Sequence, residues 1–172
     1  MDIKQYRQHV KKLATERQGE TIYNGSADHA SVIVENLFAS AHSCVRIFTG
    51  DLYAGVYGAT GVVQRARQFL GHSDHQLQVI VEKLNVSGSH PLVEELADEP
   101  KFELYELHSE LAERVSFHFS TADNDCFRFE REKGSHAAVA AFGDIETAEH
   151  LNSVFEDLLK YSQRIDNQTL LN

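Results

Sequence analysis

The side chains with the clearest capacity for chemistry alternate with apolar residues around position 120. His118 lies between two phenylalanines in VSFHFSTAD, so a strand would place it on the opposite face from both and on the same face as Ser120. A second alternating segment, DCFRFER, follows the turn at residues 123–125 and predicts the other half of an antiparallel hairpin. We therefore expect one cluster on this hairpin, formed by His118, Ser120, Asp125, Arg128 and Glu130.

Two interpretations of the hairpin stay open. A histidine on a polar strand face suits a ligand pocket, because an imidazole gains or loses a proton near neutral pH. The same histidine suits a hydrogen-bonded structural role at the sheet surface. Arg128 and Glu130 share a face of the second strand, and a simple surface ion pair explains them at least as well as a binding role.

A second group of candidate ligand-binding residues follows a strand predicted at 44–50. Open α/β sheets bind ligands at the carboxyl ends of parallel strands, and here the chain presents Thr49, Asp51 and Tyr53 in TGDLYAG. The alternative is a turn in which Asp51 caps a helix and Tyr53 packs on the surface.

Other kinds of site find little support. The glycines between residues 50 and 61 lack phosphate-loop spacing, and no Lys-Ser or Lys-Thr pair follows them. His72 and His75 share a short loop, but a structural zinc site needs four ligands and neither cysteine is near in sequence. No Ser-His-Asp arrangement is identifiable. We predict neither a metal site nor a cofactor.

The elements that must position these residues alternate between helix and strand. Periodicity predicts helices over 3–17, 27–42, about 60–70, 91–98 and after Asp144. Apolar runs predict strands at 44–50, 77–84, 101–107 and 137–142, in addition to the hairpin. This order favours an α/β fold with a mixed sheet flanked by helices and an extra N-terminal helix. The last helix should bury one apolar stripe, formed by Val154, Phe155, Leu158 and Leu159.

Length and charge limit the classes of function. The 172 residues suit one domain, and 16 Lys and Arg against 26 Asp and Glu give a formal net charge of −10. Five basic and three acidic residues lie in 1–20, which leaves eleven basic and twenty-three acidic residues for the rest. Such an acidic body repels a phosphate backbone, so we expect no broad nucleic-acid binding, although a local basic patch is compatible with these numbers.

Targeting signals are not evident in the sequence. No apolar run reaches the length of a membrane span, and the N-terminal residues lack the apolar centre of a signal peptide. These features predict a cytoplasmic protein without a membrane span. The basic helix predicted at 3–17 either contributes to a dimer, docks on an acidic partner, contacts an anionic ligand or packs on its own domain.

The segment from His118 to the last helix resembles the end of a phospholipase D-like half-domain. The signature of that family is H-x-K-x-x-x-x-D, followed by strands and a helix. His118 fills the histidine position, Asp125 fills the aspartate position, or Asp123 if the turn is shorter, and Ser120 stands where lysine is expected. The stretch GDIETAEHLNSVF resembles the start of the family's helix. The resemblance implies a phospholipase D-like domain at 25–165, after an N-terminal helix and turn at 1–24 and before a tail at 166–172.

The resemblance also implies what the site would do. In the family, two motifs face each other across a two-fold axis, one histidine attacks phosphorus and the lysines bind phosphoryl oxygens. His118 would therefore be the catalytic residue of an active protein. Serine cannot replace the charge of the missing lysine, which stabilises the transition state. A single motif copy also implies a homodimer.

Three functional hypotheses follow. The first is a non-catalytic binding or regulatory homodimer that works with a protein partner or a small phosphorylated ligand. The second is a divergent phosphodiesterase or nuclease that uses His118 from two subunits. The third is a structural assembly subunit.

Overall fold

The computed structural model describes residues 1–85 and 90–170, so the end of the expected tail, at 171–172, lies outside the described residues. Within the described residues, eight strands form one mixed sheet, in the order β1-β7-β6-β5-β2-β3-β4-β8. The strands are β1 (Ile22–Asn24), β2 (Cys44–Thr49), β3 (Gln76–Val81), β4 (Phe102–Leu107), β5 (His118–Ala122), β6 (Cys126–Glu130), β7 (Ala138–Phe142) and β8 (Ser162–Ile165). The helices are α1 (Ile3–Glu16), α2 (Ala27–Ser40), α3 (Ala54–Tyr57), α4 (Thr60–Leu70), α5 (Pro91–Leu96), α6 (Ser109–Ala112) and α7 (Ile145–Leu159), with a 3₁₀ turn η1 (Asn167–Leu170).

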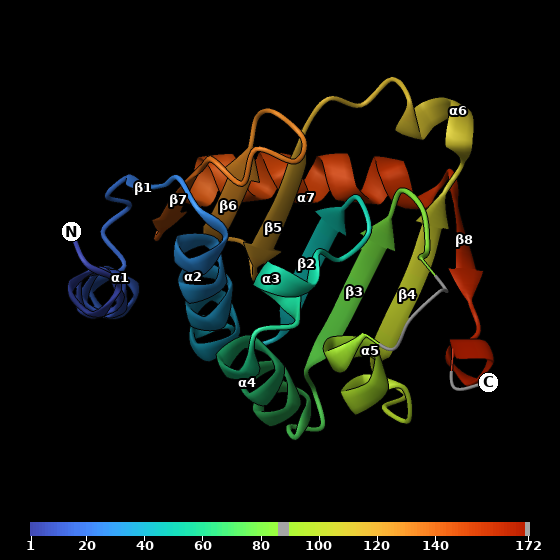
Figure 1. The fold of residues 1–172 in the computed structure, drawn as a ribbon, viewed down its shortest axis with the longest axis horizontal. Coiled ribbons are helices and arrows are strands. Elements are labelled where there is room, and N and C mark those ends of the chain that lie inside the picture. The colour runs from blue at the N-terminus through green and yellow to red at the C-terminus, as the bar shows by residue number, and fades with distance from the viewer. Residues whose placement is uncertain (86–89, 171–172) are drawn as a thin grey trace.

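Helices cover both faces of the sheet. Helix α7 crosses one face, and α2 to α5 lie on the other, with α1 packed beside α2 (Figure 1). Strands β2, β3 and β4 are parallel, whereas β5 pairs antiparallel with β2 and continues into the β5-β6-β7 meander. The α/β fold with a mixed sheet is therefore confirmed.

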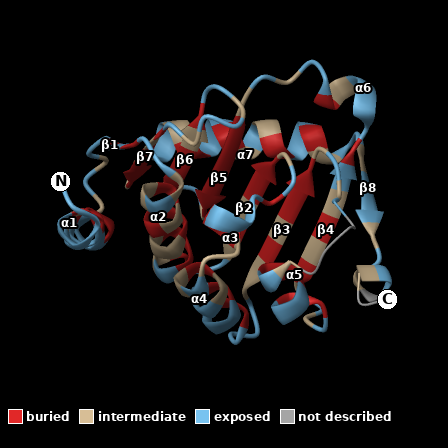
Figure 2. Cartoon of the chain, in the orientation of Figure 1, coloured by how far each residue is buried: buried red, intermediate tan, exposed pale blue. Residues whose placement is uncertain are grey.

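The core lies between the sheet and each helical layer, as the buried colour of the central strands shows (Figure 2). On α2, the face towards the core includes Ala30, Ile33, Val34, Leu37 and Phe38, which are all buried at helical spacing. On α7, Phe155 and Leu158 are buried, but Val154 and Leu159 are only half-buried. Ile3 of α1 is exposed, although Tyr6, Val10 and Leu13 are buried as the helical spacing predicts.

The hairpin differs from its expected form. Sequence alternation predicted one apolar and one polar face, and every residue of β5 is buried on both. The reason is that α7 covers the side of the phenylalanines while α2 and the segment around α3 cover the side of His118. Sequence analysis also missed β1, which lies in a turn-rich stretch, and the polar edge strand β8.

No helix among residues 1–85 and 90–170 combines the length and the apolar character that a membrane crossing requires.

Candidate functional site

Three strand ends meet at one edge of the sheet. The parallel strands β2 and β3 end side by side at Thr49 and Val81, and antiparallel β5 begins beside β2 at His118. A cavity of about 320 Å³ opens there. It is lined by Thr49, Gly50, Asp51, Tyr53, Val56, Tyr57, His118, Arg128, Glu130, Gly134 and His136. We call this cavity the His118 pocket.

His118 is buried, with 9% of its surface exposed, and lies between two carboxylates. Its Nε2 is 3.0 Å from Glu82 Oε1, and its Nδ1 is 4.0 Å from Glu130 Oε1. Because an ionised carboxylate only accepts hydrogen bonds, Nε2 carries a proton and donates it to Glu82. The other ring nitrogen, Nδ1, faces the second carboxylate, Glu130.

Arg128 is the cation of the pocket wall. Its side chain is only 2% exposed, and it donates from Nε to Asn24 Oδ1 at 3.2 Å. Nη2 donates to Glu130 Oε2 at 3.2 Å and to the His136 carbonyl at 3.1 Å. The ion pair with Glu130 predicted from the sequence therefore exists, but it is buried rather than on the surface. Nη1 takes no part in these bonds.

Lys133 compensates Glu82. Its Nζ lies 2.5 Å from Glu82 Oε1 and 2.8 Å from the Ala112 carbonyl. Lys133 reaches Glu82 because the loop after β6 folds back over the end of β3. Gly134 completes this loop by donating its backbone N–H to Glu130 Oε1 at 2.9 Å.

The charges of the site nearly cancel. Glu82 and Glu130 each have a cationic partner, Lys133 and Arg128. Asp51 adds an exposed carboxylate to the lining. Among the carboxylates and the Lys and Arg side chains of the site, there is therefore one more negative than positive charge.

The loop after β2 is held by a half-buried histidine, His90. Leu52 adopts φ 57° with its side chain buried, and its carbonyl contacts His90 Nε2 at 2.6 Å. Leu92 N–H donates to His90 Nδ1 at 3.2 Å, so Nδ1 must be unprotonated. Burial lowers the pKa of His90, against the opposing effect of the Leu52 hydrogen bond, which favours this neutral form.

The loop side chains resolve the two interpretations of this segment in part. Asp51 does not cap α3, whose N-cap is Tyr53 without a side-chain hydrogen bond. Tyr53 is half-exposed and stacks on His136 at 4.6 Å between ring centroids. Thr49, Asp51 and Tyr53 all line the His118 pocket. Ser120 lies behind this lining, where its hydroxyl is 3.4 Å from the Tyr57 hydroxyl.

Asp125 does not join the cluster that the sequence predicted. It lies at the turn end of the hairpin, where Arg17 contacts both of its oxygens, at 3.1 and 2.5 Å. His118 pairs with Glu130 at the other end. The alternative Asp123 is also away from the pocket and accepts hydrogen bonds from residues 42–44. Burial opposes ionisation of Asp123, but these hydrogen bonds outweigh it and lower its pKa.

Sequence analysis missed Glu82, Lys133 and His136, which lie around His118 or in the pocket lining. Glu82 directly follows β3, but the predicted strand at 77–84 enclosed it. The rule that selected Thr49 at the end of β2 would have found Glu82 had the strand been ended at Val81. Lys133 and His136 lie in an irregular loop and carried no such signal. Among the described residues, no cluster of His, Cys, Asp or Glu is arranged to hold a metal ion.

Several solved structures share this fold. Nuc, a phospholipase D family member from Salmonella typhimurium, gives a TM-score of 0.60 at 13% identity, over 85% of this chain and 96% of that one. NucT from Helicobacter pylori gives 0.57 at 13% identity, over 83% and 98%. TrmBL2, an archaeal chromatin protein, gives 0.62 at 11% identity, over 94% of this chain and 61% of that one. No protein-family profile and no curated protein sequence matches the chain.

These likenesses and the sheet order define a protein with a phospholipase D-like fold, as the sequence resemblance implied. At such identities the likeness concerns the fold alone. What the chain does must be argued from its own pocket.

Proposed function

We propose that this chain is a non-catalytic binding or regulatory module of phospholipase D-like fold that acts as a homodimer. The observation that carries the proposal is the position of His118 between two carboxylates, Glu82 and Glu130. A phosphodiester is an anion, and its approach to Nδ1 brings it towards the charge of Glu130. Ser120, where the family has lysine, offers no cation to offset this repulsion.

The pocket suits a small polar ligand. Its volume of about 320 Å³ lies at the lower end of small-molecule sites. The stacked rings of Tyr53 and His136 provide a flat surface, and Arg128 Nη1 and the Thr49 hydroxyl provide polar contacts. Because the cations are already paired, an uncharged polar ligand fits this pocket better than the phosphorylated ligand expected from the sequence.

A divergent phosphodiesterase or nuclease is the second candidate. It is favoured by the retained His118 and by Arg128, which pairs with Ser120 across the hairpin and could supply the missing positive charge. The similar structures include a phospholipase D family member and a phosphatidylserine synthase from Haemophilus influenzae. Arg128 is, however, bound to Glu130, which reduces the charge it offers to a substrate.

Incubation with bis(p-nitrophenyl) phosphate separates the two candidates. We expect wild type and His118→Ala to release nitrophenolate no faster than buffer. His150→Ala, which alters an exposed histidine on α7, is the matched control for contaminating activity. Turnover that disappears in His118→Ala and persists in His150→Ala would reject the non-catalytic proposal. If the site has merely lost its charge, Ser120→Lys is the smallest change that could restore turnover.

The cellular setting is also a proposal. Cys44 and Cys126 are free, and burial raises the pKa of the Cys126 thiol to about 12, so it is unreactive. Free thiols are compatible with the reducing cytoplasm. A protein partner and a purely structural assembly role remain alternatives to ligand binding.

A further inference from the structure

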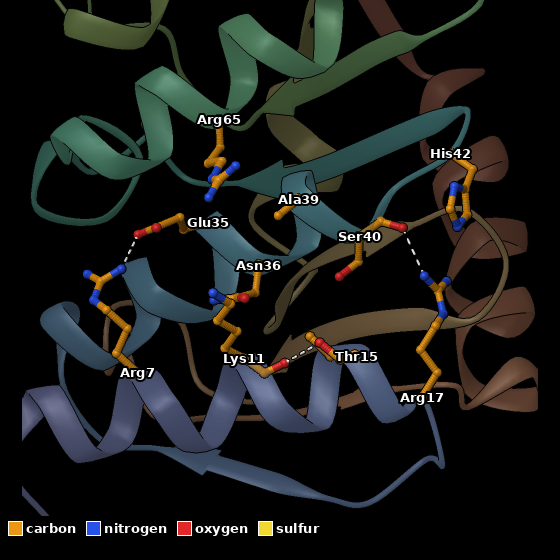
Figure 3. Close-up of a pocket in the computed structure, with 11 residues that line it drawn as sticks. Arg7, Lys11, Thr15, Arg17, Glu35, Asn36, Ala39, Ser40, His42 and Arg65 are labelled. Carbon is orange, nitrogen blue, oxygen red and sulfur yellow. Dashed lines mark hydrogen bonds and ion pairs between the residues drawn. The ribbon is translucent and has the colours of Figure 1, made fainter.

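A second cavity lies away from the His118 pocket, between α1, α2 and α4. It has a volume of about 490 Å³. Figure 3 shows its lining, with Arg7, Lys11 and Thr15 on α1, Glu35, Asn36, Ala39 and Ser40 on α2, and Arg65 on α4. We call this cavity the basic groove, because four Lys or Arg residues and a single carboxylate line it in a chain of net charge −10.

The cations of the groove differ in how far they are already paired. Arg17, at the end of the groove, donates hydrogen bonds to Asp125 and to the Ser40 carbonyl. Arg7 pairs with Glu35 at 2.5 Å but is 48% exposed. Among the described residues, neither Lys11 nor Arg65 makes an ion pair, and Arg65 Nη1 only donates to Gln68 at 3.2 Å. Lys11 and Arg65 are therefore available to an anion.

The packing of the three helices brings these charges together beside residues with small side chains. Ala14 and Ala39 also line the groove, and their small side chains add little bulk to it. Helix α4 approaches α2 closely at Gly61, where a Cβ would lie 2.5 Å from Glu35 Oε2. Arg65 follows one turn later on the same side of α4, and Figure 3 shows it directed towards the groove. Arg7 and Lys11 are also one turn apart, on α1.

Phosphate is the anion that best fits this arrangement. Guanidinium and ammonium groups approach from α1 and α4, and a phosphate has several oxygens that accept from different directions. The rest of the chain is acidic, so a phosphate-bearing ligand is repelled elsewhere and the groove is its preferred position. The volume suits a molecule of nucleotide size.

We propose that the basic groove binds the phosphate groups of a nucleotide or of a short nucleic-acid strand through Lys11, Arg65 and Arg7. This site is separate from the His118 pocket and does not depend on the function proposed there. It also gives the basic N-terminal helix a specific role, since α1 supplies two of the three cations. The groove is one local patch of positive charge. The proposal is therefore compatible with the expectation that the acidic chain does not bind nucleic acid broadly.

Fluorescence anisotropy with two probes tests the proposal. One probe is a fluorescent ATP analogue, and the other is a fluorescein-labelled oligothymidylate of about ten nucleotides. We expect at least one probe to bind, and Lys11→Glu and Arg65→Glu each to weaken binding about tenfold or more. Lys12→Glu makes the same charge change on the exposed side of α1 outside the groove and should change the affinity less than about twofold.

Further measurements keep the result specific. Circular dichroism verifies that each variant is folded, and His118→Ala should bind like wild type. If the oligonucleotide binds, log Kobs should fall with log salt with a slope of about −2, as expected for three phosphates on a single strand. Binding of the ATP analogue alone would identify a nucleotide site. The proposal fails if neither probe binds, or if Lys12→Glu or His118→Ala loses as much affinity as Lys11→Glu and Arg65→Glu. It also fails if polyglutamate displaces the bound probe as well as the unlabelled form of that probe does, because the groove would then be a site for an acidic peptide.

Discussion

Charge pairing governs the surroundings of His118. Arg128 and Glu130 are both buried, and each is hydrogen-bonded by further groups, among them Asn24 and the backbone of Gly134. Buried charges persist in folded proteins when such partners satisfy them, and removal of one partner leaves the other uncompensated. The pocket wall is therefore part of the stabilising framework as well as a candidate ligand surface.

Arg128→Ala should consequently destabilise the protein strongly. We expect a loss of about 3–5 kcal/mol in the free energy of unfolding, because Glu130 would remain buried without its cation. Arg131→Ala removes the same type of side chain from an exposed position three residues later and should stay within about 0.5 kcal/mol of wild type. Urea titration measures both values. Equal stability of the two variants would show that the ion pair does not hold the pocket wall.

Asp123 provides a pH-dependent contribution. Its carboxylate accepts hydrogen bonds from the backbone of His42, Ser43 and Cys44, and its pKa is lowered in the folded state. The stability that it adds is complete above the unfolded-state pKa of about 3.9 and is lost as the pH falls through the lower folded-state value.

Asp123→Asn should therefore lower the free energy of unfolding by about 1–3 kcal/mol at pH 7. The difference in the free energy of unfolding between wild type and the variant should decrease as the pH falls below about 4. Urea titrations at a series of pH values test this, with the exposed Asp98→Asn as the control that should show no gap at any pH. A gap that is constant from neutral pH to strong acid would contradict the assignment.

Strand alternation and the position of strand ends predicted much of the pocket lining, and the geometry of the hairpin explains why Asp125 was wrongly included. The sequence selected six residues that line one cavity, namely Thr49, Asp51, Tyr53, His118, Arg128 and Glu130. It also selected Asp125, although a strand of five residues separates the turn from His118 by roughly 13 Å. Glu82 was missed because the predicted strand at 77–84 enclosed it, and Lys133 was missed because a contact between distant segments places it beside Glu82. Whether the lining residues bind a ligand stays a prediction.

At the level of elements, periodicity identified the long helices and apolar runs identified the central strands. The buried faces of α2 and α7 follow directly from that spacing. The edge strands β1 and β8 were missed because they have only three and four residues, too few for a periodic pattern, so pairing with a neighbouring strand decides their conformation. Short α3 and α6 similarly depend on tertiary contacts.

Helix α7 should depend on Phe155 for its attachment to the sheet. Phe155 is fully buried and packs edge-on against Phe119, at 6.4 Å between ring centroids. Phe155→Ala should reduce the free energy of unfolding by about 3–5 kcal/mol, as large-to-small core changes do. Ile145→Ala, at the exposed start of the same helix, should cost less than about 0.5 kcal/mol. Near-normal stability of Phe155→Ala in urea would reject this packing role.

At the scale of the whole molecule, the two proposed sites differ in electrostatic character. The His118 pocket is charge-paired and lies at an edge of the sheet, whereas the basic groove has unpaired cations between helices. The overall charge of −10 predicted that nucleic acid would be repelled, but a sum over the chain cannot place the basic residues of α1 beside Arg65. That placement depends on the packing of α1 and α4 on α2.

A homodimer would join two His118 pockets. The chain carries one motif copy, and Tyr53 projects half-exposed at the mouth of the pocket, where an isologous partner would meet it. Sedimentation equilibrium at micromolar concentration should give a mass of about twice 19.4 kDa.

Tyr53→Asp should shift the mass towards the monomer, because two carboxylates would face each other across the two-fold axis. Tyr23→Asp makes the same change at an exposed tyrosine on β1 and should leave the dimer intact. A monomeric wild type would refute the dimer and remove any route to a site with two histidines, whereas dissociation by Tyr23→Asp alone would move the interface to the β1 edge.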